Sequence, residues 1–483
     1  SFEKRHQEID TGITGQWGVT PNLILSGALN PDFSQVEADA RQLDINTPFA
    51  LSYAEKRPFF VEGVAYFRSP LVNAVYTRSI RDPLWGAKIS GKEGANSLGG
   101  FVVEDEVTNV ILPSIESSRN ATLPGSSYAS VFRYKRDLGN RYSVGALVTS
   151  REGQDYFNRV YGADGDFRLT DKDRFTLQWL GSTTRYPADF ADRHQQPRGS
   201  FTDGAMALQY AHQTRSVYWS TEIADYGEDF RADLGFEPQV GGREYYGELG
   251  YQWVPEKDTW FTSISVEGEY EYLEDDSGRP VRRTGDVHFW YLGPLQSQIG
   301  GRIYKRRESF NGREFDILYY GGSASFIPNQ SISAGLSTSF GNMIDYANTQ
   351  LGDRVGLYPY LDLKLGDHLE VDLEYTYEQL DVPGGRLYTA DILQGTVIYQ
   401  LNVRTFIRSI LQYVDYRYSP DLYTLPREPE FRQLFTQFLF SYKINPRTVL
   451  FMGYSDNYYA GQGYDLTQAD RSFFAKVGYS WQF

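Results

Sequence analysis

Several residue types are missing or scarce in this chain of 483 residues, and each absence excludes a class of protein. Without cysteine there can be no disulfide, thiolate metal site or cysteine-attached haem, and the lack of thiols fits an oxidising compartment. No apolar run approaches the roughly 20 residues that a helix needs to cross a bilayer. The sequence therefore excludes a helical membrane protein.

Positive charge is also in short supply. The formal net charge is -15 at pH 7, and nucleic-acid binding depends on clustered lysine and arginine, so we expect no nucleic-acid partner. The opening "SFEKRHQEID" is polar and contains no apolar leader. We expect either that a signal peptide has been removed or that the chain is the later part of a longer precursor.

What the chain has in abundance is aromatic residues, at 16%, although its mean hydropathy is only -0.48. The rings recur at every second position, as in "HLEVDLEYTYEQ" from His368 and "WFTSISVEGEYEY" from Trp260. A period of two places apolar side chains on one face of a strand and polar ones on the other. The sequence thus predicts many amphipathic strands.

Two kinds of connection alternate between these strands. Short turns such as "LTDKDR" at 169 and "LGDH" at 365 are rich in Gly, Pro, Asn or Asp, whereas "RYPADFADRHQQPRGSFTDG" from Arg185, "LEDDSGRPVRR" from Leu273 and "YSPDLYTLPREPE" from Tyr418 are long and polar. This asymmetry is typical of outer-membrane barrels, whose periplasmic turns are short and whose extracellular loops are longer. We therefore predict an all-β transmembrane antiparallel barrel of about 24 strands, with a range of 22 to 26.

The chain ends in "FFAKVGYSWQF", an alternating strand that stops at an aromatic ring. Its last residues are similar to the terminal signal that the outer-membrane assembly machinery recognises, carried here by Gly478, Tyr479, Trp481 and Phe483. An ordinary buried edge strand is the alternative. We further expect an interfacial aromatic girdle at strand ends that face short turns, formed by Trp179, Trp253, Trp260, Tyr377, Trp481 and Phe483.

Three segments interrupt the hairpin pattern: "NPDFSQVEAD" at 30–39, "EKRPFFVEG" at 55–63 and "GAKISGK" at 86–92. Together with the terminal signal, they resemble a family of bacterial outer-membrane barrels of unassigned function. Members usually carry the barrel after a module similar to family-nine carbohydrate-binding domains, which is absent from this sequence. The resemblance implies a fold and an integral outer-membrane location, with lipid, lipopolysaccharide and the assembly machinery as partners, and leaves the mechanism open.

The domain organisation follows from these patterns. Residues 1–21 are expected to form a periplasmic lead-in or a first strand, and residues 22–483 the barrel. Pro58 cannot donate a ladder hydrogen bond, so the stretch around it is not a plain strand. We hypothesise that residues 31–70 fold inward as a plug-like segment, with Glu55, Lys56, Arg57, Phe59 and Phe60 at its centre, because a barrel of this size has room for one. A periplasmic linker or an ordinary extracellular loop remains the alternative.

The polar strand faces supply the candidate lumen residues. The carboxylates are Glu267, Glu269, Glu271, Glu370, Asp372 and Glu374, and the cations are Arg302 and Arg306, with Arg133 and Lys135 as further candidates. Cross-paired or solvated wall residues without a ligand are the simpler interpretation. If the bore is open, the acidic excess predicts a preference for cations.

Enzymatic and cofactor chemistry has little support. His194 lies near Asp189 and Asp192 in a long loop, but no Gly-flanked nucleophilic serine and no histidine pair at metal-ligand spacing is present among the five histidines. We expect no enzyme, no cofactor and no dedicated metal site.

Beside an enzyme, which the sequence supports least, two functions remain. The first is a transport conduit for a solute or polymer, with a carbohydrate link implied by the resemblance and Tyr358 and Tyr360 able to stack on sugar rings. The second is a non-conducting anchor or scaffold for an N-terminal module or a partner protein.

Overall fold

The computed structural model describes residues 13–29, 39–257, 259–445, 448–461 and 463–479. Their strands are β1 (Ile13–Thr20), β2 (Leu23–Leu29), β3 (Pro83–Glu93), β4 (Asn96–Asp105), β5 (Thr108–Pro113), β6 (Ser118–Leu123), β7 (Ser127–Leu138), β8 (Tyr142–Gly153), β9 (Tyr156–Arg168), β10 (Asp173–Arg185), β11 (Ser200–Gln213), β12 (Val217–Tyr226), β13 (Gly242–Trp253), β14 (Ser263–Asp275), β15 (Pro280–Leu292), β16 (Gln298–Phe310), β17 (Arg313–Asn329), β18 (Ile332–Asp345), β19 (Gln350–Leu365), β20 (Leu369–Val382), β21 (Gly385–Asn402), β22 (Thr405–Tyr418), β23 (Glu430–Asn445), β24 (Thr448–Gly461) and β25 (Tyr464–Tyr479). The helices are short: α1 (Pro58–Val61), α2 (Ala188–His194), and the 3₁₀ turns η1 (Val64–Tyr66), η2 (Thr77–Ser79), η3 (Pro294–Gln296) and η4 (Pro420–Leu422).

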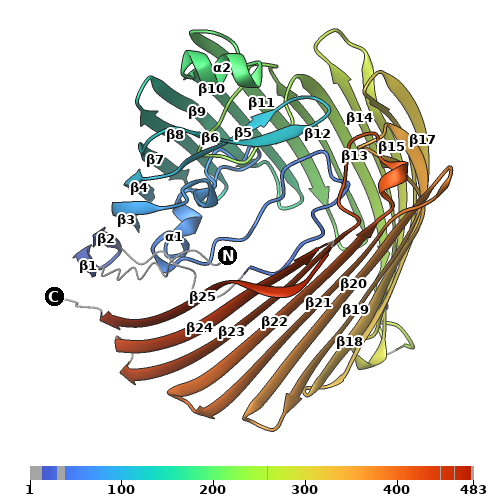
Figure 1. Cartoon of the computed structure of the whole chain (residues 1–483). Coiled ribbons are helices and arrows are strands. Elements are labelled where there is room, and N and C mark those ends of the chain that lie inside the picture. Colours follow the sequence, from blue (N-terminus) through green and yellow to red (C-terminus); the bar gives the residue numbers. More distant parts are fainter. Residues whose placement is uncertain (1–12, 30–38, 258, 446–447, 462, 480–483) are drawn as a thin grey trace.

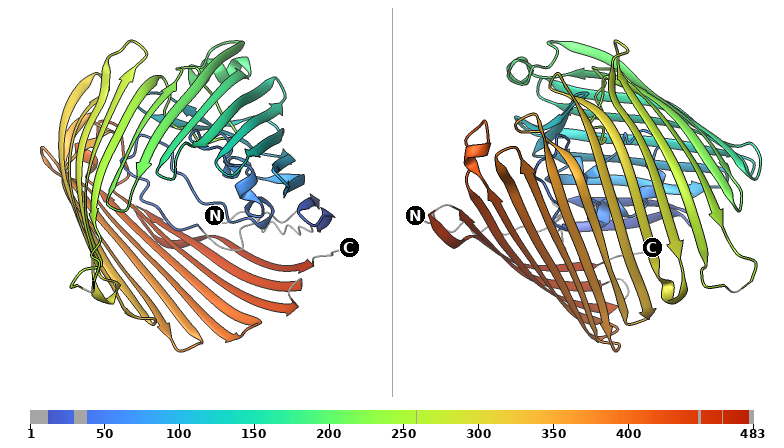
Figure 2. Two further views of the ribbon diagram at one scale, coloured as in Figure 1. Left: turned by 180° about the vertical axis from the view of Figure 1, so that it is seen from behind. Right: turned by 90° about the vertical axis from the view of Figure 1, so that its right-hand side faces the viewer.

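All strands except β5 and β6 belong to one antiparallel sheet of 23 strands, in which each strand pairs with its neighbours along the chain. The sheet curls into a barrel, and its outermost strands β1 and β25 come to the same side of the molecule (Figures 1 and 2). This confirms the predicted fold class and lies within the predicted range of strand number. In the described part of the chain, no helix is long and apolar enough to span a membrane.

Side chains alternate between an apolar outer face and a mixed inner face. On β8, Val144 and Val148 are exposed, whereas Leu147, Thr149 and Arg151 are buried against groups inside the barrel. Large apolar side chains are exposed in the same way along the outside of strand after strand. Exposed apolar side chains on most strands of the sheet would be unstable in water, so this outer surface is solvated by lipid hydrocarbon.

The two ends of the barrel differ in their connections. At one end the turns are mostly two to four residues, such as 21–22, 94–95, 139–141 and 169–172, and at the other end lie the long segments 30–82, 106–126, 186–199, 227–241 and 419–429. This is the predicted asymmetry. Two details of the prediction are wrong: Leu273–Arg283 is mostly strand, with a tight turn between β14 and β15, and 86–92 lies within β3, an ordinary barrel strand.

The expected aromatic girdle is only partly correct. Trp253 ends β13 and Trp260 follows it in a short-end connection, where its ring stacks on Tyr291 at 5.5 Å between centroids. Trp179 and Tyr377 instead lie in the middle of β10 and β20. Alternation identifies the outward face of a strand but does not tell how far along the strand a residue lies. Trp481 and Phe483 are outside the described residues.

The connection between β2 and β3 lies inside the barrel over its described part, residues 39–82 (Figure 1). Here we call residues 39–82 the inner segment. Its apolar side chains pack in a buried cluster with inward-facing residues of β4 and β7–β12. The cluster includes Phe59, Phe60, Phe67, Val72, Ala74 and Ile80 from the inner segment and Phe101, Val131, Leu147, Val160 and Leu180 from the wall. A smaller cluster joins Ile45 to β20–β22.

The lipid-facing assignment can be tested within one strand. Leu373 faces outward on β20 and is 40% exposed, and Thr376 lies on the opposite face beside the inward Glu374. Leu373→Arg should reduce the free energy of unfolding in liposomes by roughly 2–4 kcal/mol, because the charge enters hydrocarbon. Thr376→Arg is the matched control and should have little effect. Equal losses in the two variants, measured by urea titration, would contradict the assignment.

Candidate functional site in the barrel interior

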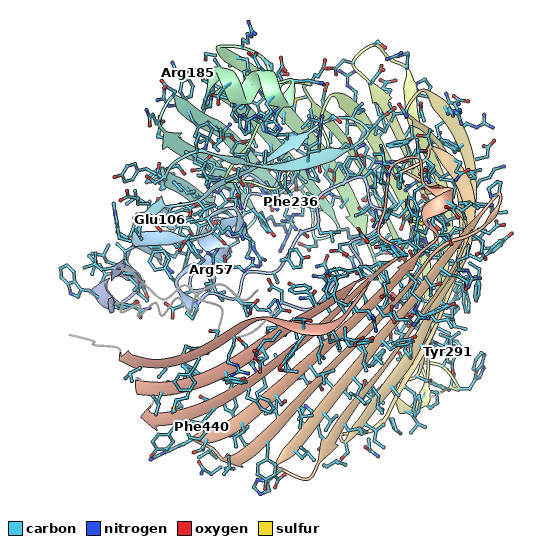
Figure 3. The ribbon with its side chains drawn as sticks, viewed as in Figure 1. Arg57, Glu106, Arg185, Phe236, Tyr291 and Phe440 are labelled. Carbon is cyan, nitrogen blue, oxygen red and sulfur yellow. The ribbon has the colours of Figure 1, made fainter. Side chains whose placement is uncertain are left out.

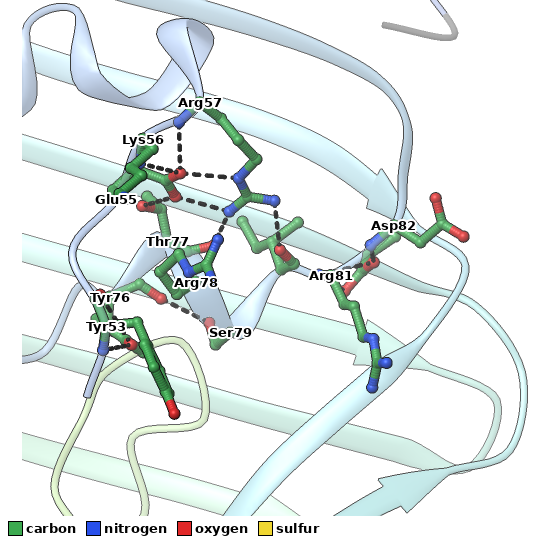
Figure 4. Close-up of polar contacts among 12 residues, drawn as sticks. Tyr53, Glu55, Lys56, Arg57, Tyr76, Thr77, Arg78, Ser79, Arg81 and Asp82 are labelled. Atoms are coloured by element: carbon green, nitrogen blue, oxygen red, sulfur yellow. Dashed lines mark hydrogen bonds and ion pairs between the residues drawn. The ribbon is translucent and has the colours of Figure 1, made fainter. Parts of the chain in front are cut away.

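Arg57 is the centre of a polar cluster that shapes the inner segment (Figure 4). Its guanidinium donates two hydrogen bonds to Glu55, of 2.7 and 2.8 Å, and one each to the carbonyls of Ile80 and Thr77. It also lies over the Phe60 ring, 4.5 Å from the centroid. Arg57 is 4% exposed, so this arrangement holds a buried cation with nearly all of its donors satisfied.

Glu55 is the matching anion. Burial alone would raise its pKa, but the hydrogen bonds and charge of Arg57 and a hydrogen bond from Thr77 outweigh burial and hold the pKa below its usual value. Lys56 points instead toward Asp39, with 4.0 Å between Nζ and the carboxylate, and Asp39 also pairs with Arg78. Of the residues predicted for the plug-like segment, Phe59 and Phe60 are buried in its apolar cluster.

The inner segment is attached to two opposite parts of the wall. On one side, the backbone N–H groups of Leu71 and Val72 donate to Gln178 of β10, each at 2.9 Å. On the other, Asn46 bonds to the backbone of Ile344 and Tyr346 at 2.8 and 3.0 Å. Further bonds join Asp44 to Tyr416, and Asp39 and Arg41 to Gln412 and Gln394. The segment therefore crosses the bore from β10 to β22.

Two other long connections meet the inner segment inside the barrel. The hairpin of β5 and β6 joins it through a bridge between Ile80 and Thr108. The loop 227–241 contributes Asp233, whose carboxylate accepts hydrogen bonds from Tyr156 and Tyr186 at 2.6 and 3.1 Å. Beneath them Arg151, fully buried, pairs with the equally buried Asp105 at 2.7 Å. Arg151 also donates to the carbonyls of Asn109, Asp233 and Ser79, and so links the hairpin, the loop and the inner segment.

A cavity of about 820 Å³ lies where the three connections meet. Its lining includes Tyr53, Tyr76, Arg78 and Arg81 of the inner segment, Asn109 and Asn120 of the hairpin, and Phe236 and Glu237 of the loop. Figure 3 shows Arg57 and Phe236 on the inside of the sheet and Tyr291 at its outer surface. The volume is in the range of small-molecule sites. Aromatic rings, amides and cations together suit a polar ligand with apolar faces.

Arg81 has guanidinium donors in this lining that are available to a ligand. Its backbone N–H bonds to Asp105, but its guanidinium has no hydrogen bond or ion pair within the described residues, and the side chain is exposed. An arginine presents up to five donors in a plane. Arg81 is therefore able to bind a carboxylate, a phosphate or a row of hydroxyls in the cavity.

The lumen candidates from the sequence all face inward. Most are paired with a neighbour: Glu271 with Arg282, Arg306 with Glu308, and Arg302 with Asp286. Nearer the short turns, Glu370 lies 3.4 Å from Lys364 and Asp372 stands opposite Asp362, while Glu374 is exposed to the lumen. Arg133 is buried in a pair with Asp164. Gly478 and Tyr479 end β25, and the rest of the terminal signal is outside the described residues.

His194 is the sequence candidate nearest to a catalytic or metal-binding patch. It ends α2, where its ring packs on Phe190, and the two carboxylates near it in sequence are paired with Arg193 and Arg198. The sequence reasoning gave no role to Arg81, to the loop 227–241 or to His288. These residues meet their neighbours through strand register and loop conformation, and the sequence pattern predicts neither.

Comparison with known proteins supports the fold. A family profile described as a domain of unknown function (DUF5916) matches residues 2–92, and no curated protein matches the chain. The chain is similar to a mutant of the ferric enterobactin receptor of Pseudomonas aeruginosa in complex with enterobactin, at 10% identity over 82% of this chain and 78% of that one, with a TM-score of 0.51. The FrpB iron transporter from Neisseria meningitidis gives the same identity, coverage and TM-score.

These likenesses concern the fold alone, because the identity is 10%. With the apolar outer surface, they define the class of protein: an integral β-barrel of the bacterial outer membrane. The neighbours are transport receptors rather than enzymes. The matched profile covers the first barrel strands and the inner segment and brings no function with it.

The Arg57 cluster makes a testable prediction about the inner segment. Arg57→Ala leaves the Glu55 carboxylate and two carbonyls without their partner, which should weaken docking of residues 39–82 by about 3–5 kcal/mol. Hydrogen exchange and limited proteolysis of these residues should rise while the strands stay protected. Arg68→Ala, at an exposed arginine of the same segment, is the control. Unchanged exchange in Arg57→Ala would show that the apolar contacts alone hold the segment.

Glu237 predicts a pH dependence of the same region. Its carboxylate accepts a hydrogen bond from the Asn73 N–H at 2.5 Å, and burial raises its pKa to about 7 despite that bond and one from Tyr226. The folded state then binds a proton more tightly than the unfolded state, so docking is strongest below about pH 4.5 and weakens as the pH rises toward 7.

In Glu237→Gln this pH dependence should disappear, and the loop should be better docked at pH 8 than in the wild type, by roughly 2–3 kcal/mol. Hydrogen exchange of residues 71–76 and 227–241 at pH 5 and pH 8, corrected for the intrinsic rate, measures the effect. If the pH dependence persisted in Glu237→Gln, it would have to come from another titratable group.

Proposed function

We propose that the chain is a transport conduit for a polar solute across the outer membrane. The inner segment makes its large apolar cluster with β4 and β7–β12 and only a smaller one, through Ile45, with β20–β22. In the other half of the bore, the inward side chains of β14 and β20 nearer the short turns are polar. Exposed polar side chains such as Ser337 and Glu374 line that second half of the bore. This uneven filling is the observation on which the proposal rests, because a purely structural plug would be expected to cover both halves.

For the solute we propose a carbohydrate or a carbohydrate-linked molecule. Tyr360 projects into the lumen beside Glu374, and the cavity walls carry Tyr53, Tyr76 and Phe236 together with amides and Arg81. Rings next to hydroxyl-binding groups are the combination that saccharides require. The iron and siderophore cargo of the two similar structures belongs to those proteins, and a shared fold carries no substrate with it.

The alternative is a non-conducting anchor or scaffold, and one observation favours it. Arg57, Arg151 and Asp105 are almost completely buried in the bonds that fix the inner segment, the hairpin and the wall. Breaking such pairs is costly, so a segment held this way would open rarely. In this function the barrel would present an N-terminal module or hold a partner protein at the surface.

Single-channel recording in planar bilayers separates the two. A conduit should carry a steady, cation-selective current, because Glu370, Asp372 and Glu374 line the lumen, and soluble oligosaccharides should block it. The triple variant Glu370→Gln, Asp372→Asn, Glu374→Gln should lower the cation-to-anion permeability ratio by several-fold. The control is a second triple variant, Glu256→Gln, Glu314→Gln and Asp316→Asn, which removes the same number of charges outside the lumen. A silent barrel, also after Arg57→Ala, would favour the scaffold.

A further inference from the structure

Four ionisable side chains form a compact block on the inner wall. In the register of β14 and β15, Glu267 stands directly opposite His288, and Glu269 directly opposite Asp286. All four lie on the inward face, since the intervening Val266, Tyr270, Val287 and Phe289 are exposed on the outside. Directly opposed side chains of an antiparallel pair have Cβ atoms about 5 Å apart. The register therefore brings two rows of ligand-type groups together.

Several ligand-type atoms of this block lie close together. Ligand atoms of Glu267, Glu269 and His288 all lie within 4.8 Å of one another. Nε2 of His288 is 3.5 Å from Oε1 of Glu269 and 3.2 Å from Oδ2 of Asp286, yet it makes a hydrogen bond to neither. Asp286, whose side chain is 1% exposed, also has an oxygen, Oδ1, without a partner. The converging atoms of Glu267, Glu269 and His288, with an imidazole nitrogen that makes no hydrogen bond within the described residues, suit a shared cation.

The charges of the block do not balance. Glu248 of β13 stands opposite Glu269, so Glu248, Glu269 and Asp286 form a row of carboxylates across three adjacent strands. Like charges directly opposite one another destabilise a sheet. Arg302, opposite His288 on β16, pairs with Asp286 and neutralises it. Within the described residues, Glu267 and Glu269 then have no lysine or arginine of their own as an ion-pair partner.

We propose that Glu267, Glu269 and His288 bind a divalent transition-metal cation on the lumen wall, with Asp286 as an additional oxygen donor. Two carboxylates and an imidazole supply the charge and the mixed oxygen and nitrogen ligands that zinc, manganese or ferrous iron accept. Hard cations such as calcium need more oxygens and no nitrogen. Carboxylate and imidazole sites of this kind follow the order in which zinc binds more tightly than manganese.

Two neighbours hold the ligands in place. The Tyr218 hydroxyl donates to Oε2 of Glu267 at 2.5 Å and leaves the other oxygen of that carboxylate for the cation. Nε of Arg302 donates to Oδ2 of Asp286 at 2.6 Å and fixes the carboxylate next to the imidazole. Such supporting bonds orient metal ligands. His288 is 15% and Glu269 24% exposed, so a cation can reach both from the lumen.

Isothermal titration of the full-length barrel in detergent with zinc chloride at pH 7 tests the proposal. We expect one zinc ion per chain, with weaker binding of manganese at the same site. His288→Gln and the pair Glu267→Gln, Glu269→Gln should each weaken zinc binding by about 10-fold to 100-fold, and Asp286→Asn by about 10-fold. Cobalt, used as a spectroscopic probe, should give visible absorption bands that His288→Gln abolishes.

The control site is the opposed pair Asp362 and Asp372 of β19 and β20, which has two carboxylates and no imidazole nearby in register. Asp372→Asn should leave zinc binding unchanged. The proposal would be overturned if the wild type bound no zinc, or if His288→Gln bound zinc as tightly as the wild type. His288 would then be a side chain that pairs with Asp286 only when it is protonated. Because binding is measured without a membrane potential, the result stands apart from whether the barrel conducts.

Discussion

The interaction on which the whole structure depends is the hydrogen-bonded ladder of a sheet placed in hydrocarbon. Lipid offers no partner to a backbone N–H or C=O, so each strand must bond to a neighbour on both sides along its length. In the described residues, 21 of the 23 strands of this sheet have a partner on both sides, and the edge strands β1 and β25 each pair with one neighbour. A strand with both neighbours has one face for lipid and one for the interior. The alternation of apolar and polar residues with a period of two reflects these two faces.

A sheet of this size encloses more space than its own side chains can fill, and the chain fills it with connections instead. The inner segment, the β5–β6 hairpin and the loop 227–241 all start from the end of the barrel that carries the long connections. Their backbone groups are bonded to one another and to inward side chains such as Gln178, Asn158 and Arg151. Buried loops are tolerated only when their polar groups are satisfied in this way. The buried arginines are thus a consequence of placing irregular chain inside a barrel.

The sequence predicts this architecture unevenly, and the reason is physical. Strand faces follow from local alternation, so the inward position of Glu267, Glu370 and Arg302 could be predicted correctly. Tight turns follow from Gly, Asn and Asp, but the prediction of a long loop over Leu273–Arg283 is wrong, because charged residues continue through both strand ends and only 276–279 form the turn. The contacts of Arg57 with Glu55 join residues only two positions apart. Those of Asn46 with Ile344, and of Asp233 with Tyr156, join residues far apart in sequence, and no local pattern encodes them.

The same limit explains why His288 received no role. Metal-binding histidines on a helix recur at spacings of three or four residues, and no two of the five histidines have that spacing. In a sheet, the relevant neighbours lie on the adjacent strand, and their separation in sequence depends on the length of the hairpin. Glu267 and His288 are 21 residues apart, yet the register of β14 and β15 places them directly opposite each other. A one-residue slip of β15 would place His288 on the lipid face and Val287 in its stead. The lumen chemistry of this barrel is therefore determined by register, and register is held by the outward apolar face that cannot leave the membrane.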